Sequence, residues 1–148
     1  HMGARPGIDG NMTYQLHIVP PAFVGRAWMD GASQLGKACD TSGGEITGDQ
    51  LKMILARGER TLIRIDRDGQ TAGWAVTRID QLPNVRALHV CELYAPGGNW
   101  AACFDLLADM ARANGCTEMR CSAKPAQVRL YQRHHDWVPL YQTLKVDL

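Results

Sequence analysis

The amino-acid sequence predicts an α+β domain whose mixed, mostly antiparallel sheet carries helices on both faces. Three apolar runs follow one another between residues 60 and 95, and the first two meet at Asp68-Gly69, a strong signal for a two-residue hairpin. The pattern then changes to strand, helix and strand over residues 86–124, which is typical of a crossover between neighbouring strands. A meander followed by a crossover predicts helices that cover the sheet from both sides.

The composition indicates a soluble globular domain. The chain has 148 residues, of which 45% are hydrophobic and 21% are charged, and its formal net charge is +1. These values argue against a disordered chain, and the low net charge favours neither nucleic acid nor a membrane as the main partner. We expect residues 1–11, which begin with a His1-Met2 tag remnant, to be flexible, and residues 12–148 to form a single domain.

Cysteine usage indicates a reducing compartment. The five cysteines form an odd set without a Cys-x-x-Cys pair, so we expect no disulfide framework and a cytoplasmic protein. Cys91 and Cys103 flank the turn that precedes a predicted helix, where their thiols are either reactive or, the interpretation that we favour, serve as small hydrophobic side chains.

In the first half of the chain, some elements have a clear sequence pattern and others have a weak one. Residues 12–19 alternate in polarity and predict a strand, and residues 21–38 predict a helix that three glycines weaken. A second helix is expected over residues 47–58, because Thr47 and Gln50 have the spacing of a capping box.

The second half contains the predicted crossover and a closing strand. After the strand over residues 86–95, a helix is expected from Asn99 to Gly115 and a short strand over residues 117–124. Pro125 suits the first turn of a further helix. Residues 137–148 alternate in polarity again, so we predict one long strand or a strand pair at the end.

The turn before the Asn99 helix has the features of an anion site. Its Gly97 and Gly98 leave the backbone open to close approach, and the first helical residues Ala101, Ala102 and Cys103 are small. Free backbone N–H groups and the helix dipole favour a phosphate at such a terminus. The same turn also suits a plain connection between two packed elements, with Asn99 as the cap.

With this turn, the order of elements resembles the GNAT superfamily of acyl-CoA-dependent N-acyltransferases. The resemblance covers residues 12–148 in topology and is most specific over residues 86–137, where Leu106-Leu107, Gly115 and Tyr131 fall at family positions. The turn departs from the family pattern. Gly98 stands where Arg or Gln is usual, and Ala101 and Cys103 stand where the family has glycine and Gly/Ala.

The resemblance implies an N-acyltransferase that carries an acyl group, expected to be acetyl, from acetyl-CoA or another acyl-CoA to an amine by direct attack. It places the acyl-CoA on nine residues: Leu93, Tyr94, Gly97, Gly98, Asn99, Trp100, Ala101, Ala102 and Cys103. It makes Tyr131 the acid for the leaving thiolate and Glu92 the candidate base, with a water chain as the alternative. The rival interpretation is a catalytically inactive GNAT-like protein that acts as a binding or structural module.

The acceptor and the assembly stay open at this point. A polyamine acceptor would predict an acidic lining, for which Asp30, Asp40, Glu45 and Asp49 are available, and a protein acceptor is equally open. In this fold a C-terminal strand sometimes pairs across a homodimer. The adjacent His134 and His135 point in different directions on a helix, so we expect surface histidines and no metal site.

Overall fold

The computed structural model describes residues 5–6, 13–97 and 100–148 and confirms the α+β class. Six strands form one sheet in chain order, and every neighbouring pair is antiparallel except β5–β6, which is parallel. The strands are β1 (Arg5–Pro6), β2 (Thr13–Val19), β3 (Thr61–Arg67), β4 (Gln70–Gln81), β5 (Arg86–Tyr94) and β6 (Glu118–Cys121). The two-residue β1 was not predicted from the sequence.

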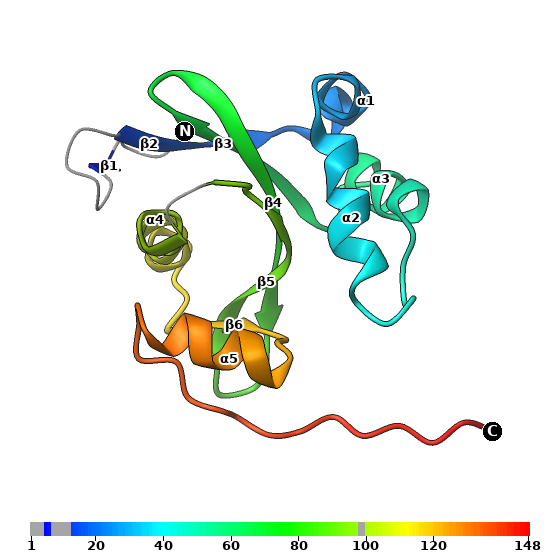
Figure 1. Cartoon of the computed structure of the whole chain (residues 1–148), viewed down its shortest axis with the longest axis vertical. Helices are drawn as coiled ribbons and strands as arrows, with labels where there is room; N and C mark the ends of the chain where they lie inside the picture. The colour runs from blue at the N-terminus through cyan, green and yellow to red at the C-terminus, as the bar shows by residue number, and fades with distance from the viewer. Residues whose placement is uncertain (1–4, 7–12, 98–99) are drawn as a thin grey trace.

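Helices cover both faces of the sheet, as predicted (Figure 1). They are α1 (Val24–Met29), α2 (Leu35–Asp40), α3 (Gly48–Ala56), α4 (Trp100–Ala113) and α5 (Pro125–Gln132), with 3-10 turns η1 (Pro21–Phe23) and η2 (Ala32–Gln34). In Figure 1, α4 lies on one side of the curved sheet and α1 to α3 lie on the other. Within the described ranges, no helix has the length and apolar character required to span a bilayer.

Two hydrophobic cores hold these layers together. The core on the α4 side joins Leu106 and Leu107 to sheet residues such as Leu88 and Val90. The core on the other side joins α1, α2 and α3 to sheet residues such as Val76. The sheet is therefore buried on both faces, which explains the long apolar centre of the β5 sequence.

Two local sequence predictions are confirmed in detail. Thr47 accepts a hydrogen bond from the Gln50 N–H, and the Gln50 side chain accepts one from the Thr47 N–H, which completes the capping box of α3. The β3–β4 hairpin turns at Asp68 and Gly69, both of which have positive φ (52° and 81°). The Asn99 cap predicted for α4 lies outside the described residues.

Two element predictions were wrong. The single helix expected over residues 21–38 is divided into α1 and α2 by Gly31, whose φ of 127° is incompatible with a helix. The closing strand expected over residues 137–148 is not formed, and residues 133–148 contain neither helix nor strand. An alternating pattern becomes a strand only when another strand pairs with it. This segment instead runs past α5 with most of its apolar side chains exposed (Figure 1).

Gly73 fixes the distance between β4 and the end of β5. A Cβ atom at this position would lie 2.4 Å from the Tyr94 carbonyl oxygen and 2.8 Å from the Ala95 Cα. Both are backbone atoms of the segment that leads to α4, so only a glycine allows this approach without a shift.

We predict that Gly73→Ala lowers the free energy of unfolding by about 1–3 kcal/mol, because the added methyl group overpacks the backbone. Gly25→Ala is the matched control, since nothing lies within 4 Å of its ideal Cβ and it sits in α1. The control is expected to be neutral or to stabilise by up to ~1 kcal/mol. Urea unfolding measures both variants, and equal effects would contradict the close approach at Gly73.

Candidate active site

The site begins where β5 separates from β6. Parallel pairing joins residues 87–90 of β5 to residues 118–121 of β6, and no described residue of β6 pairs with β5 beyond Val90. On the other side, pairing with β4 continues to Tyr94, although Cys91 is an extra residue between Val90 and Glu92. This bulge and the end of the β6 pairing leave the backbone groups of residues 91–94 on that edge without a strand partner.

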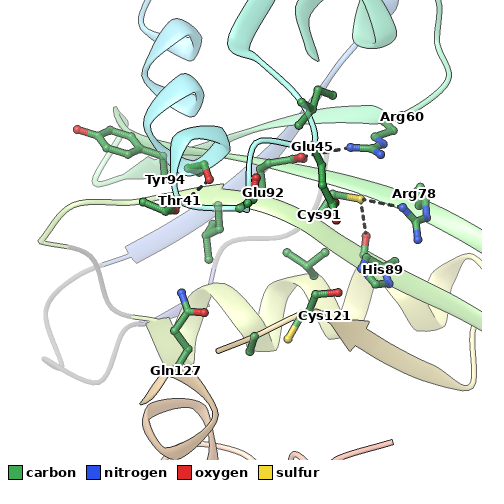
Figure 2. A pocket seen from close by; sticks show the side chains of 18 of the residues that line it. Thr41, Glu45, Arg60, Arg78, His89, Cys91, Glu92, Tyr94, Cys121 and Gln127 are labelled. Atoms are coloured by element: carbon green, nitrogen blue, oxygen red, sulfur yellow. Dashed lines mark hydrogen bonds and ion pairs between the residues drawn. The ribbon is translucent and has the colours of Figure 1, made fainter. Parts of the chain in front are cut away.

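A cavity of about 1340 Å³ opens along this gap. Its walls come from residues 89–94 of β5, from α2 and α3 with their connecting loop, and from the stretch between Cys121 and Tyr131 on the opposite side. Figure 2 shows the β5 side chains Cys91 and Glu92 between Arg60 and Arg78 on one side and Tyr94 on the other. Its volume lies above the range that is typical of small-molecule pockets.

Glu92 is the buried carboxylate of this cavity, with a residue exposure of 7%. It stands opposite Val76, a residue of the core formed with α1, α2 and α3, so it points to that face of the sheet. Its Oε1 accepts a hydrogen bond from Arg60 Nη1 at 3.2 Å, and its Oε2 has no partner within the described ranges. Burial raises the pKa of Glu92 even though Arg60 and Arg78 act to lower it.

Tyr131 reaches the same cavity from α5. Its ring packs against Phe104 of α4, with the ring centroids 5.5 Å apart, and against Trp137, with the centroids 6.1 Å apart. Burial, with a smaller contribution from the Cys121 thiol, raises the pKa of Tyr131. Its hydroxyl therefore stays protonated at neutral pH, and its position is fixed by aromatic packing.

Gly97, the last described residue before α4, is not among the residues that line the cavity. Gly97 has a φ of 65° and open space where a Cβ would stand. Its carbonyl oxygen accepts a hydrogen bond from Arg67 Nη1 at 3.2 Å, which brings a cation from the end of β3 to the turn. Ala101, Ala102 and Cys103 are buried in the first turn of α4. Gly98, Asn99 and the Trp100 side chain lie outside the described part of the chain.

Comparisons with known proteins find similar structures but no similar sequences. No protein-family profile and no curated protein sequence matches the chain. A ribosomal-protein-alanine N-acetyltransferase from Brucella melitensis biovar Abortus superposes with a TM-score of 0.67 at 15% identity, covering 91% of this chain and 99% of that one. A glucosamine-6-phosphate N-acetyltransferase from Arabidopsis thaliana gives a TM-score of 0.60 at 15% identity, covering 90% and 97%.

An aminoglycoside acetyltransferase from an uncultured soil metagenomic sample is also similar, with a TM-score of 0.58 at 11% identity over 89% of this chain and 97% of that one. The chain has the GNAT fold. At these identities the similarity shows the fold alone, and the three proteins are named for three different acceptors.

The site residues predicted from the sequence separate into two groups, according to whether they line the cavity. Glu92, Leu93, Tyr94 and Tyr131 line one cavity, although they come from two elements on either side of the gap. Gly97, Ala101, Ala102 and Cys103 do not line it, and the last three are directed into buried packing. The roles assigned to both groups stay predictions.

Sequence reasoning missed three arginines. Arg60 and Arg78 line the cavity beside Glu92, and Arg67 reaches the turn before α4. Their spacing along the chain gave no signal, because alternating charges on strands are typical of an exposed face. Only the register of β3, β4 and β5 brings them to the site.

The histidine pair is partly as expected. His134 is exposed, whereas His135 is half-buried, with its Nε2 2.9 Å from Asp105 Oδ1 on α4. The surface interpretation was therefore wrong for His135, because α5 ends at Gln132 and the chain turns back toward α4. No group of three or more metal-ligating side chains occurs in the described residues.

The two cysteines that the sequence analysis singled out, Cys91 and Cys103, are poor nucleophiles. Burial raises the pKa of Cys103 to about 11, and burial with the nearby Glu92 carboxylate raises the pKa of Cys91 to about 11 despite Arg60 and Arg78. Cys103 is 1% exposed and belongs to the α4 core. Both thiols are protonated at neutral pH, which favours the hydrophobic interpretation over acylation.

We predict slow alkylation of Cys91 by iodoacetamide. At pH 8 its thiolate fraction should be about 100-fold below that of an ordinary thiol, because the raised pKa favours the protonated form. The rate should still rise through pH 9, where glutathione, the reference thiol, begins to level off. Peptide mass spectrometry follows the reaction, and Cys91→Ser identifies the modified site. A rate that levels off below pH 8.5 would contradict the raised pKa.

Proposed function

We propose that this protein is an acyl-CoA-dependent N-acyltransferase that transfers an acetyl group to an amine. The observation that carries the proposal is the buried Glu92, which lines the cavity near the point where β5 leaves β6 and whose Oε2 has no hydrogen-bond partner among the described residues. A buried carboxylate oxygen without a partner is costly, and its place on the open edge of β5 suits a base.

The described residues fit an acyl-CoA in two places. At the turn before α4, Gly97 leaves room for a phosphate, and Arg67 supplies a cation that the sequence pattern lacks at Gly98. Along the gap, backbone N–H groups near Leu93 and Tyr94 would hold the acyl carbonyl oxygen. The co-substrate supplies the acyl group as a thioester together with a thiolate leaving group.

In this mechanism, Glu92 and Tyr131 each carry out one proton transfer. The acceptor nitrogen forms a bond to the acyl carbon, and the carbon–sulfur bond breaks. Glu92 accepts the proton that the nitrogen loses, directly or through a water chain, and its raised pKa makes it a stronger base than an exposed carboxylate. The Tyr131 hydroxyl donates a proton to the leaving sulfur.

We also assign the protein to the cytoplasm, which the five free cysteines support.

The first test is binding of acetyl-CoA, measured by calorimetry with free CoA as the comparison. We expect micromolar affinity in the native chain and a loss of about 10-fold or more in Arg67→Gln, because a charge-assisted hydrogen bond to phosphate is removed. Arg112→Gln, at the far end of α4 with a 74% exposed side chain, is the matched control and should bind normally.

Substitutions at the start of α4 are less suitable for this binding test. Ala101 is 8% exposed, so an acidic side chain there would disturb the core. No binding of acetyl-CoA at millimolar concentration by the folded protein would exclude the enzyme and leave the non-catalytic, GNAT-like binding module. The degenerate turn is the feature that keeps this rival open.

The second test separates binding from chemistry. Glu92→Gln keeps the size of the side chain and removes the base, so kcat should fall by about 10²–10⁴-fold. Its affinity for acetyl-CoA should stay within about 2-fold of the native value, because acyl-CoA contacts are assigned elsewhere. Thiol release with an amine acceptor gives kcat. An unchanged kcat would remove Glu92 from the mechanism.

A further inference from the structure

The cavity has more positive charge than a plain amine acceptor requires. Six of its lining residues are cationic: Lys37, Arg57, Arg60, Arg78, Lys124 and Lys145. Two are acidic, Glu45 and Glu92. Even when Asp80 and Asp147, the ion-pair partners of Arg78 and Lys145, are counted with the acids, cations exceed acids by two, whereas the whole chain has a net charge of only +1.

Arg78 and Glu92 project from the same face of the sheet. Val76 and Arg78 are two residues apart on β4 and stand opposite Glu92 and His89 of β5. Val76 belongs to the core with α1, α2 and α3, so Arg78 and Glu92 face that side. The α4 helix packs on the other face, against Leu88 and Val90. Arg78 therefore lies away from the turn to which the phosphates of acyl-CoA are assigned.

Among the described residues, both arginines near Glu92 have N–H donors without a partner. A guanidinium has five N–H groups. Arg60 uses one on Glu92, and Arg78 uses two, one at 2.9 Å on Asp80 and one at 3.9 Å on the Cys91 sulfur. Their side chains are 23% and 38% exposed, so the remaining donors are open to a ligand. Figure 2 shows Arg60 and Arg78 on one side of Cys91, with His89 close by.

The pKa of His89, which lines the cavity beside Arg78, is consistent with this charge balance. Burial lowers the pKa of His89, and Arg78, Arg60 and Arg120 lower it further, against an opposing effect of Asp80. A neutral imidazole at this position leaves the positive charge to the arginines. Of the four acids that a polyamine acceptor was expected to use, only Glu45 lines the cavity.

We propose that the acceptor is an amine that also carries an anionic group, a carboxylate or a phosphate, which binds Arg78 and Arg60 while the ammonium group reaches Glu92. The inference rests on the proposed function for the role of the amine. The anion site itself stands on the arginines and is testable without acyl-CoA. Polycationic acceptors are disfavoured, because the same charges repel them.

The test compares amines that differ only in the anion. O-phosphoethanolamine is paired with ethanolamine, β-alanine with propylamine, and spermidine represents a polycation. Binding to the full chain is measured at low salt by calorimetry without acyl-CoA. The anionic member of at least one pair should bind about 10-fold tighter or better, with weaker binding at high salt. The pair that shows the preference distinguishes phosphate from carboxylate.

Arg78→Gln should reduce this preference to about 2-fold or less, because its charge-assisted hydrogen bonds are lost. Arg78→Glu should reverse the preference in favour of spermidine. Arg78 is chosen over Arg60 because removing Arg60 would leave the buried Glu92 without a partner. Arg112→Gln is again the matched control and should keep the native preference.

Equal binding within every pair, tighter binding of spermidine, no binding of any probe, or a preference that survives Arg78→Gln would each overturn the anion site. Acetyl-CoA binding is measured on the same samples. An anion preference that depends on Arg78 in a protein that does not bind acetyl-CoA would refute the acyltransferase and keep the anion site. Acetyl-CoA binding without an anion preference would refute the anion site and keep the acyltransferase.

Discussion

Strand β5 has one residue more than the stretch of β4 that faces it, and its pairing with β6 stops at Val90. The rest of the site depends on this mismatch. The extra residue, Cys91, directs Glu92 to the face covered by α1, α2 and α3, and the missing β6 partner exposes the β5 backbone to the cavity. A regular sheet through the same residues would have closed the gap and satisfied those backbone groups.

The electrostatics of the cavity follow from that geometry. Once Glu92 is turned inward, it needs a cation, and Arg60 provides one from the segment between α3 and β3. Burial still outweighs this partner and raises the pKa of the carboxylate. One oxygen is paired with Arg60, and the other is buried without a partner among the described residues, so the carboxylate is anchored by a single hydrogen bond.

The wall of the cavity opposite Glu92, which includes Tyr131 of α5, is held in place by aromatic packing instead of charge. Phe104 of α4 contacts Tyr131 and Trp137 edge to face, with ring centroids 5.5 Å apart in both pairs. These contacts fix α5 and the first residues after it against α4 without a closing strand. The positions of Tyr131 and of the Trp137 ring therefore do not require residues 138–148 to join the sheet. The homodimer suggested for that segment stays a prediction.

By itself the sequence determined the parts that depend on local chemistry. The Asp68-Gly69 hairpin, the capping box of Thr47 and Gln50, and the α5 start at Pro125 each follow from the preferences of a few neighbouring residues. The strand-helix-strand pattern also predicted the α+β class. Glu92 and Tyr131 came from a family resemblance, and the structure brings them to one cavity.

Only the tertiary structure decided the rest, because it depends on which segments meet. Residues 137–148 alternate like a strand, but no strand in the described part of the chain pairs with them. Arg67, Arg60 and Arg78 have ordinary sequence surroundings, and strand register carries them to Gly97, Glu92 and Cys91. Local preferences act over a few residues, whereas these contacts join positions 13 to 32 residues apart, so no local pattern specifies them.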